Sequence, residues 1–180
     1  DIGGGSMQLS LYDKGELVTT QNMKLGTLRI HEMLSSVTPD TVDENRLIEE
    51  LLGNELETFR RLFLKDRKIE NLIGIGDVIT SFASDPETHL PYEKMKAEEF
   101  QELYRKIRKT VPEDLAEDLD IPPVTAAMIP ACAMAYSEVL NITGAENMWL
   151  PGITLCDGIA ADYAERAKIL KLGRDFEEDI

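Results

Sequence analysis

The sequence opens with DIGGGS (residues 1–6), and this stretch decides how the rest is interpreted. Three successive glycines let the backbone approach a ligand closely, so that its N–H groups can point at phosphate oxygens. Asp1 precedes the glycines, where a carboxylate can hold Mg²⁺ or its waters, and Ser6 follows them as a hydroxyl donor. Glycines alone are typical of a flexible turn, but the flanking Asp and Ser favour a phosphate loop.

The segment after this loop predicts a β-hairpin. Residues 8–12 and 16–23 read as two strands around the turn Asp13-Lys14-Gly15. A glycine-rich turn normally leaves a preceding strand, yet no residue of the sequence precedes Asp1. We therefore expect the sequence to begin inside a strand–turn–strand unit.

The remaining elements follow from hydrophobic periodicity and from glycine and proline positions. We expect a helix that follows Pro39-Asp40-Thr41, capped by Asp40 or Thr41, with its apolar stripe over 47–63. We also expect helices at 28–34, 77–82, 94–109, 124–140 (bent at Pro130) and 154–172, and strands at 72–75 and 147–150. Helices that alternate with strands after an initial hairpin predict an α/β fold with a mixed β-sheet flanked by helices.

Composition excludes several classes of protein. The chain has 180 residues and a formal net charge of −15, which argues against binding to DNA or to an anionic membrane. We expect no membrane-spanning segment, because no uninterrupted apolar run approaches about 20 residues. Cys132 and Cys156 have no metal-ligand spacing, so we expect a cytoplasmic protein in which both thiols are small core residues.

Four segments resemble, in order, the exopolyphosphatase/guanosine pentaphosphate phosphohydrolase (Ppx/GppA) family. They are DIGGGS (1–6) with LGTLR (25–29), NLIGIGDVITSFA (71–83), VTAAMIPACAMAYSEVL (124–140) and ITLCDGIAADYA (153–164). The resemblance implies a ribonuclease-H-like lobe of the actin-like ATPase superfamily. Residues 1–180 then form a single second lobe, and the first lobe and any C-terminal helical domain are absent from this sequence.

The resemblance also implies roles for individual residues. It makes Asp1 and Gln8 catalytic, with Asp1 also a ligand of a Mg²⁺ cofactor. It assigns phosphate binding to Gly3, Gly4, Gly5, Ser6 and Gly26, and it places Gly74, Gly76 and Gly158 in turns at the interface between lobes. Gln8 departs from the family, which usually has a glutamate there, and a neutral amide cannot act as a general base.

The implied activity is hydrolysis of a terminal phosphoanhydride in polyphosphate or guanosine pentaphosphate. We expect this chain alone to be inactive, because its partner in the intact protein is the first lobe, which this sequence lacks. The sequence is also compatible with a homodimer. Two alternatives of the same fold remain: a regulatory protein that binds phosphate compounds without hydrolysis, and an actin-like ATP-dependent kinase or ATPase.

Two other patterns have simpler structural explanations. Gly74 and Gly76 suggest a dinucleotide fingerprint, but position 79 is Ile79 rather than the third glycine. The basic stretches 60–68 and 105–109 could contact a polyanion, yet both fall at predicted helix ends, where cations complement the helix dipole. We expect both stretches to be structural.

Overall fold

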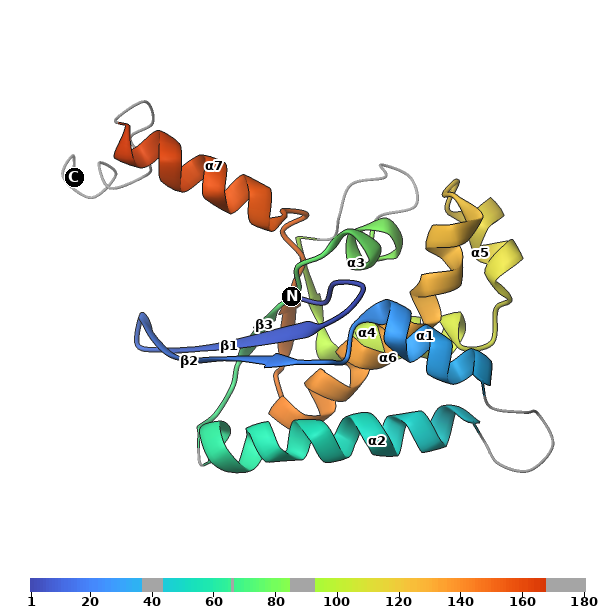
Figure 1. Ribbon diagram of the computed structural model, residues 1–180, viewed down its shortest axis with the longest axis horizontal. Coiled ribbons are helices and arrows are strands. Elements are labelled where there is room, and N and C mark those ends of the chain that lie inside the picture. Colours follow the sequence, from blue (N-terminus) through green and yellow to red (C-terminus); the bar gives the residue numbers. More distant parts are fainter. Residues whose placement is uncertain (37–43, 66, 85–92, 168–180) are drawn as a thin grey trace.

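Helix α6 (Pro123–Thr143) lies at the centre of the fold, and shorter helices pack around it (Figure 1). The fold is known from a computed structural model, which describes residues 1–36, 44–65, 67–84 and 93–167. The helices against α6 are α1 (Thr27–Ser36), α2 (Glu44–Phe59), α3 (Asp77–Phe82), α4 (Ala97–Ile107) and α5 (Pro112–Asp118). A helix surrounded in this way needs apolar side chains on all faces, as the sequence of α6 has.

The ends of α6 follow from local chemistry. It begins at Pro123, whose missing N–H costs nothing in the first turn of a helix, and it ends at Gly144 with φ 65°. Its 21 residues are long and apolar enough to cross a membrane by length and composition alone, although Ser137, Glu138 and Asn141 interrupt the apolar run. Most of α6 is nevertheless buried in the protein, as expected of a core helix.

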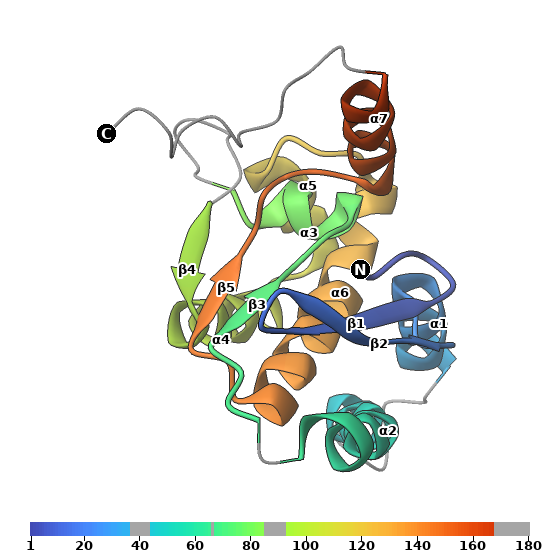
Figure 2. The same cartoon turned by 90° about the vertical axis from the view of Figure 1, so that its left-hand side faces the viewer.

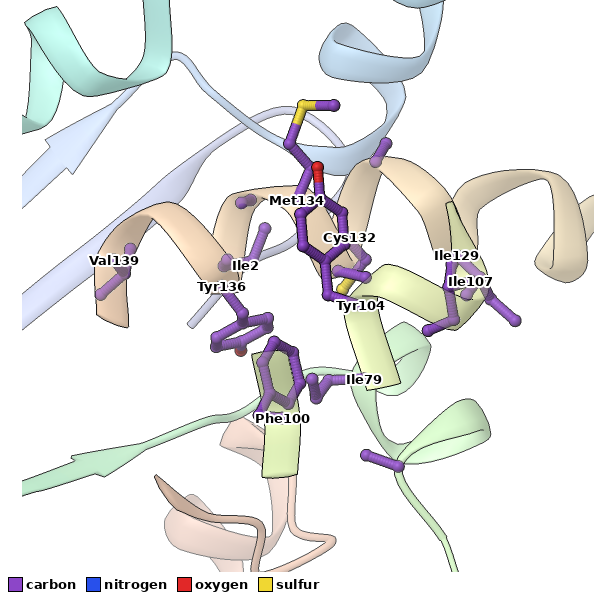
Figure 3. Packing of buried hydrophobic residues seen from close by; sticks show 14 of the residues in the cluster. Ile2, Ile79, Phe100, Tyr104, Ile107, Ile129, Cys132, Met134, Tyr136 and Val139 are labelled. Atoms are coloured by element: carbon purple, nitrogen blue, oxygen red, sulfur yellow. The ribbon is translucent and has the colours of Figure 1, made fainter. Parts of the chain in front are cut away.

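The core forms where α6 meets the apolar face of α4 (Figure 3). Phe100, Tyr104 and Ile107 are buried at helical spacing on α4, as their periodicity predicts. The Phe100 ring meets the Tyr136 ring of α6 edge-on, with centroids 6.3 Å apart. Cys132 is buried in the same cluster, and burial raises the pKa of its thiol, so this cysteine is a core residue as predicted.

The strands form two sheets (Figure 2). Strands β1 (Met7–Asp13) and β2 (Glu16–Met23) are the predicted antiparallel hairpin. Strands β3 (Asn71–Ile73), β4 (Lys94–Lys96) and β5 (Asn147–Trp149) form a mixed sheet in which β5 is central, parallel to β3 and antiparallel to β4. The predicted α/β fold with a mixed sheet and flanking helices is confirmed.

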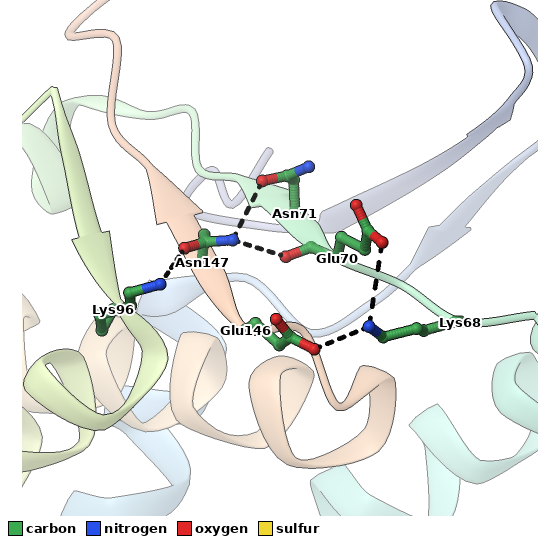
Figure 4. Close-up of polar contacts among 6 residues, drawn as sticks. All are labelled: Lys68, Glu70, Asn71, Lys96, Glu146 and Asn147. Atoms are coloured by element: carbon green, nitrogen blue, oxygen red, sulfur yellow. Dashed lines mark hydrogen bonds and ion pairs between the residues drawn. The ribbon is translucent and has the colours of Figure 1, made fainter.

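Polar side chains form hydrogen bonds and ion pairs between neighbouring segments of the mixed sheet (Figure 4). The Asn147 amide donates to the Glu70 carbonyl at 3.3 Å and accepts from the Lys96 ammonium at 3.0 Å. Lys68 pairs with Glu146 at 2.9 Å, and Arg67 pairs with Asp13 of β1 at 3.2 Å. These cations of the first basic stretch therefore form ion pairs within the protein, in agreement with the structural interpretation.

The structure differs from the sequence-based prediction at the start of α4 and at α5. The predicted cap of α2 at Asp40 or Thr41 lies outside the described residues. Helix α4 begins at Ala97 because residues 94–96 form β4, in which Met95 is buried between two exposed lysines. Helix α5 was not predicted; Pro112 at its start and Glu113 and Asp114 in its first turn are typical helix-start residues. The last helix, α7 (Leu155–Arg166), is described to Arg166, and its predicted continuation over 168–172 lies outside the described residues.

Backbone hydrogen bonds connect the glycine loop (residues 1–6) to both sheets and to α1. The Ile2 N–H donates to the Ile75 carbonyl, just after β3, at 3.2 Å. The Thr27 and Leu28 N–H groups at the start of α1 donate to the carbonyls of Gly3 and Gly4 at 2.9 and 3.0 Å. Loop carbonyls thus satisfy helix-start amides that would otherwise lack partners.

Gly26 makes this docking of α1 on the loop sterically feasible. A Cβ atom at position 26 would overlap the Gly4 carbonyl and the Ser6 nitrogen. Gly26 is itself buried, so the overlap could be relieved only by moving the loop backbone. The absence of a side chain at this position is therefore a requirement of the loop's placement.

Tyr136 fixes the turn that follows β3. Its hydroxyl donates to the Ile75 carbonyl at 2.7 Å and accepts from the Ile75 N–H at 3.1 Å. Burial raises the pKa of Tyr136 well above its usual range, so the hydroxyl remains protonated and able to donate. One buried side chain of α6 thereby holds the residue to which Ile2 is bonded.

We expect Tyr136→Phe to lower the free energy of unfolding by about 1–3 kcal/mol, because it leaves the Ile75 N–H without its partner in a buried site. Urea unfolding followed by circular dichroism would measure the change. Tyr12→Phe, on the exposed face of the hairpin, is the matched control and should have no measurable effect. Equal stability of the Tyr136 variant and the wild type would show that this hydroxyl does not hold the turn.

We expect Gly26→Ala to destabilise the protein by about 1–3 kcal/mol, because the added methyl group must displace the loop backbone. Gly5→Ala is the matched control, since nothing lies within 4 Å of a Cβ at that position. Thermal unfolding of the two variants compares them directly. A Gly26 variant as stable as the Gly5 variant would contradict the proposed packing of loop on helix.

Candidate functional site: a cavity at three converging turns

A cavity of about 340 Å³ lies where three turns of the chain meet. Residues 1–4 of the glycine loop line one side, and residues 75–78, which lead from β3 into α3, line another. Residues 154–156 at the start of α7 and Thr27 of α1 complete the wall. The fold thus brings together segments that are 70 to 150 residues apart in the sequence and that the resemblance singled out.

The glycine loop is a tight turn with free donors. Asp1 and Gln8 exchange backbone hydrogen bonds of 3.0 and 2.8 Å, and the Gly3 N–H donates to the Ser6 carbonyl at 3.0 Å. Within the described residues, the N–H groups of Gly4 and Gly5 make no hydrogen bond. Both glycines are exposed, so these two N–H groups are available to an anion.

The second turn uses glycine in two different ways. Gly76 has φ 138°, a conformation that residues with a side chain rarely adopt, and a Cβ there would lie 3.0 Å from the Ile2 carbonyl oxygen. Gly74 instead solves a packing problem, because a Cβ there would lie within 3.0 to 3.2 Å of Leu150, Met148 and Tyr136. Of these two glycines, Gly76 lines the small cavity, whereas Gly74 is buried and does not line it.

The third turn is the start of α7. The Asp157 carboxylate accepts from the Thr154 N–H and the Thr154 hydroxyl, each at 2.7 Å, in a capping box. These hydrogen bonds hold the pKa of Asp157 below its ordinary value. Asp157 is therefore occupied in capping the helix. Cys156 beside it is exposed, so its prediction as a core residue was wrong.

The prediction that Cys156 is a core residue was wrong because of the environment of α7. No residue of α7 is buried, and Leu155, Ile159 and Tyr163 are 60 to 70% exposed along one stripe. An apolar stripe at helical spacing normally predicts burial, and the same pattern misled the prediction for Cys156. Gly158 lies inside the first turns of this helix rather than in a separate turn, and nothing lies within 4 Å of a Cβ built there.

The other predicted site residues are distributed around the loop. Gln8 faces a second, larger cavity, and Gly5 and Ser6 do not line the small one. The Ser6 nitrogen lies against Gly26. Gly26 acts sterically here, because the helix-start amides after it bond to loop carbonyls. Thr27 was missed: its hydroxyl donates to the Gly3 carbonyl at 3.1 Å, and its only sequence signal is a hydroxyl residue right after Gly26.

The electrostatics of the cavity are acidic. Asp1 and Asp77 are among the residues that line it, and none of the described residues that line it is Lys or Arg. In the part of the chain that the structure describes, no three His, Cys, Asp or Glu residues cluster as a metal site. Two carboxylates beside free amides do not form an all-protein cage, but they fit Mg²⁺ that is held partly by a bound phosphate.

Comparison with known proteins gives a match in structure. No protein-family model matches the sequence, and no curated protein is significantly similar to it. The fold is similar to that of an exopolyphosphatase from Cytophaga hutchinsonii, with a TM-score of 0.77 and 15% identity over 92% of this chain and 55% of that one. It is also similar to a Ppx/GppA family member from Aquifex aeolicus, with a TM-score of 0.75 and 16% identity over 92% and 55%.

An exopolyphosphatase-like protein gives a TM-score of 0.76 at 18% identity, over 93% of this chain and 57% of that one. The chain thus spans a little over half the length of the solved structures that it matches. The predicted resemblance is confirmed at the level of the fold: the protein has an α/β fold like that of about half of each Ppx/GppA-type chain that it matches.

Proposed function

We propose that this chain is the phosphate-binding part of an enzyme that hydrolyses the terminal phosphoanhydride of polyphosphate or guanosine pentaphosphate. The free N–H groups of Gly4 and Gly5, beside a cavity bounded by two carboxylates, support this proposal most directly. Phosphoryl transfer needs positioning and charge neutralisation more than covalent help from the protein. Similarity in fold to an exopolyphosphatase and to a Ppx/GppA family member supports the same class of substrate.

The residues of the chain would divide the work of binding. The Gly4 and Gly5 amides hold the terminal phosphate, and the Ser6 hydroxyl donates a further hydrogen bond from the end of the loop. Asp1 and Asp77 face the cavity from opposite turns and hold Mg²⁺ or its waters. The metal ion supplies neutralisation of phosphate charge when it is bound. The fixed backbone around Ile2 and Ile75 keeps the amides in place for this anion.

Hydrolysis further requires an oriented water molecule. Gln8 cannot accept a proton as a carboxylate can, and it is a lining residue of the larger cavity rather than of the small one. The resemblance assigns a water-orienting glutamate to a first lobe, which this sequence does not contain. The proposed enzyme is therefore a longer protein in which another segment faces the glycine loop.

A second candidate function is a regulatory protein that binds phosphate compounds without hydrolysing them. Two observations favour it: the amide at position 8, and the absence of Lys or Arg among the described residues that line the cavity. Both reduce the means to stabilise a transition state. Hydrolysis of the phosphoanhydride by the longer protein would distinguish the enzyme from the regulatory protein. Binding of a phosphate compound by the loop is expected of both.

We expect the chain to bind tripolyphosphate in the presence of Mg²⁺, with an affinity that calorimetry can measure. Gly5→Val should weaken binding at least about tenfold, because it blocks amide approach and one charge-assisted contact contributes roughly 1.5–3 kcal/mol. Asp1→Asn should weaken the Mg²⁺-dependent part by a similar factor. Gly53→Ala on α2 is the matched control and should bind like the wild type.

Stability measurements make this experiment decisive. A Cβ at Gly5 meets nothing within 4 Å, so Gly5→Val should unfold at the wild-type temperature. A variant that is folded and binds poorly would place the anion at the loop. If both loop variants bind tripolyphosphate as well as the Gly53 control does, the loop is not the site.

We expect little or no phosphate release from polyphosphate or guanosine pentaphosphate by the chain alone, because one loop leaves the attacking water unoriented. In the longer protein, Gln8→Glu should leave turnover unchanged or raise it. The measurement is steady-state phosphate release with Mg²⁺. Release by the isolated chain at the rate of the longer protein would contradict the need for a second segment.

A further inference from the structure

Strand β2 forms one edge of the β1–β2 sheet. In the described part of the chain, no strand other than β1 pairs with it. From Leu17 to Met23 it contains no Asp, Glu, Lys, Arg or Pro, in a chain of which 29% is charged. Exposed edge strands usually carry such residues, because their unpaired N–H and C=O groups otherwise bind another strand. The edge of β2 lacks that protection.

Strand β4, at an edge of the mixed sheet, is protected in the usual way. It is three residues long, and its first and last residues are the exposed lysines Lys94 and Lys96. Charged residues on a short edge strand oppose the addition of a further strand. The two edges therefore differ in kind: β4 is short and basic, whereas β2 is longer and uncharged over most of its length.

The pairing of β1 with β2 shows which backbone groups β2 leaves open. Gln8 bonds to Asp1 rather than to β2, so its partner Asn22 also directs its N–H and C=O away from β1. The same alternation applies to Thr20, two residues earlier, which lies opposite Ser10. The backbone groups of Thr20 and Asn22 make no hydrogen bond to any other described segment. These two residues are the open donors and acceptors of the edge.

Side-chain contacts within the hairpin hold this edge in shape. The hydroxyls of Ser10 and Thr20 share a hydrogen bond of 2.9 Å across the two strands. The Gln21 amide donates to the Thr19 hydroxyl at 2.8 Å. Near the turn, Val18 is the extra residue of a β-bulge, where the pairing with β1 shifts. The regular edge therefore begins at Thr19 and continues to the end of the strand.

We propose that β2 is the docking edge for β2 of a second copy of this chain, antiparallel to it about a two-fold axis at Gln21. In this register Thr20 of each copy lies opposite Asn22 of the other, and the two residues exchange their backbone hydrogen bonds. The two hairpins then form one sheet in the order β1, β2, β2, β1. Because both copies use the same surface, the contact closes as a dimer.

The bulge selects this register from its neighbour. With the axis at Thr20, that residue would pair with itself and Asn22 would lie opposite Val18 of the other copy. The backbone at a bulged residue departs from the regular ladder, so Asn22 would have no well-placed partner. With the axis at Gln21, both open residues of each copy are paired.

Charge favours a second copy in the antiparallel orientation. With a net charge of −15, two copies repel each other, so a stable contact requires an edge without acidic residues. The first charged residues beyond the neutral segment are Glu16 and Lys24, and neither has an ion-pair partner among the described residues. Antiparallel pairing brings the Lys24 end of one copy to the Glu16 end of the other, whereas parallel pairing would bring like charges together.

Sedimentation equilibrium of the unmodified chain, from about 10 µM to 1 mM, tests whether the dimer forms. We expect a monomer–dimer equilibrium with a Kd below about 1 mM. The Thr20 and Asn22 amides should exchange with solvent at least about twofold more slowly at the highest concentration than at the lowest. A chain that remains monomeric at 1 mM overturns the proposal. No phosphate is needed, so the result is independent of the proposed function.

Two double variants test the register. Thr20→Glu with Asn22→Lys sets opposite charges across the interface and should leave the Kd unchanged or lower it. Thr20→Lys with Asn22→Lys sets like charges there and should raise the Kd at least about tenfold. The second variant makes the chain less negative, so a non-specific effect of charge would favour association instead. Equal Kd values for the two variants would show that β2 is not the interface.

A cysteine at the axis tests position rather than charge. In a Cys156→Ser background, which removes the exposed thiol, Gln21→Cys should form a disulfide-linked dimer with oxidised glutathione. The reason is that facing residues of a non-hydrogen-bonded pair have Cα atoms about 4.5 Å apart, within the range of a disulfide. Thr19→Cys, which would face Met23 of the other copy, is the matched control and should form much less. No covalent dimer from Gln21→Cys, or equal yields from the two variants, would refute the register.

Discussion

The backbone of residues 1–4 is the constraint on which the site depends. Within these residues it bonds to Gln8 of β1, to Ile75 after β3, and to the first two amides of α1. Contacts between backbones leave no room for side chains, so Gly26 and Gly76 must be glycine where they touch the loop. One tight turn thus determines residue identity at two positions far away in the sequence.

Local patterns were sufficient to predict the hairpin, the buried face of α4 and the central helix. Each of these has a clear period, of two residues in β1 and of 3.6 in α4, and α6 is long and apolar throughout. The family resemblance, rather than a local pattern, singled out the three segments that line the small cavity, although Gly158 of the third segment does not line it.

The remainder required tertiary information. Residues 94–96 continue the polar character of α4, and only pairing with β5 makes them a strand. Cys156 and its neighbours have the composition of a buried helix, yet in the part of the chain that the structure describes no residue of α7 is buried. Gly74 and Gly76 look alike in sequence, but one accommodates three side chains of the core and the other a backbone carbonyl. The periodicity of a segment indicates which of its residues tend to be buried. The residues that bury them lie elsewhere in the chain, so the segment alone does not identify them.

Charge sets a further limit on how this protein could hold an anion. The chain has a net charge of −15, and no Lys or Arg is found among the described residues that line the small cavity, so their side chains do not attract an anion. In the first basic stretch, Arg60, Arg67 and Lys68 form ion pairs within the protein. Backbone amides remain as donors, and they carry no net charge, so carboxylates beside them favour a phosphate that arrives with its metal ion.

The two cavities meet at Asp1 and Ile2, whose backbone lines both. The loop for which we propose anion binding is therefore continuous with two residues that are held on both sides. Asp1 exchanges backbone hydrogen bonds with Gln8 of β1, and Ile2 donates to the Ile75 carbonyl after β3. Precise placement of backbone amides requires a rigid supporting element, and these hydrogen bonds supply it at the start of the loop.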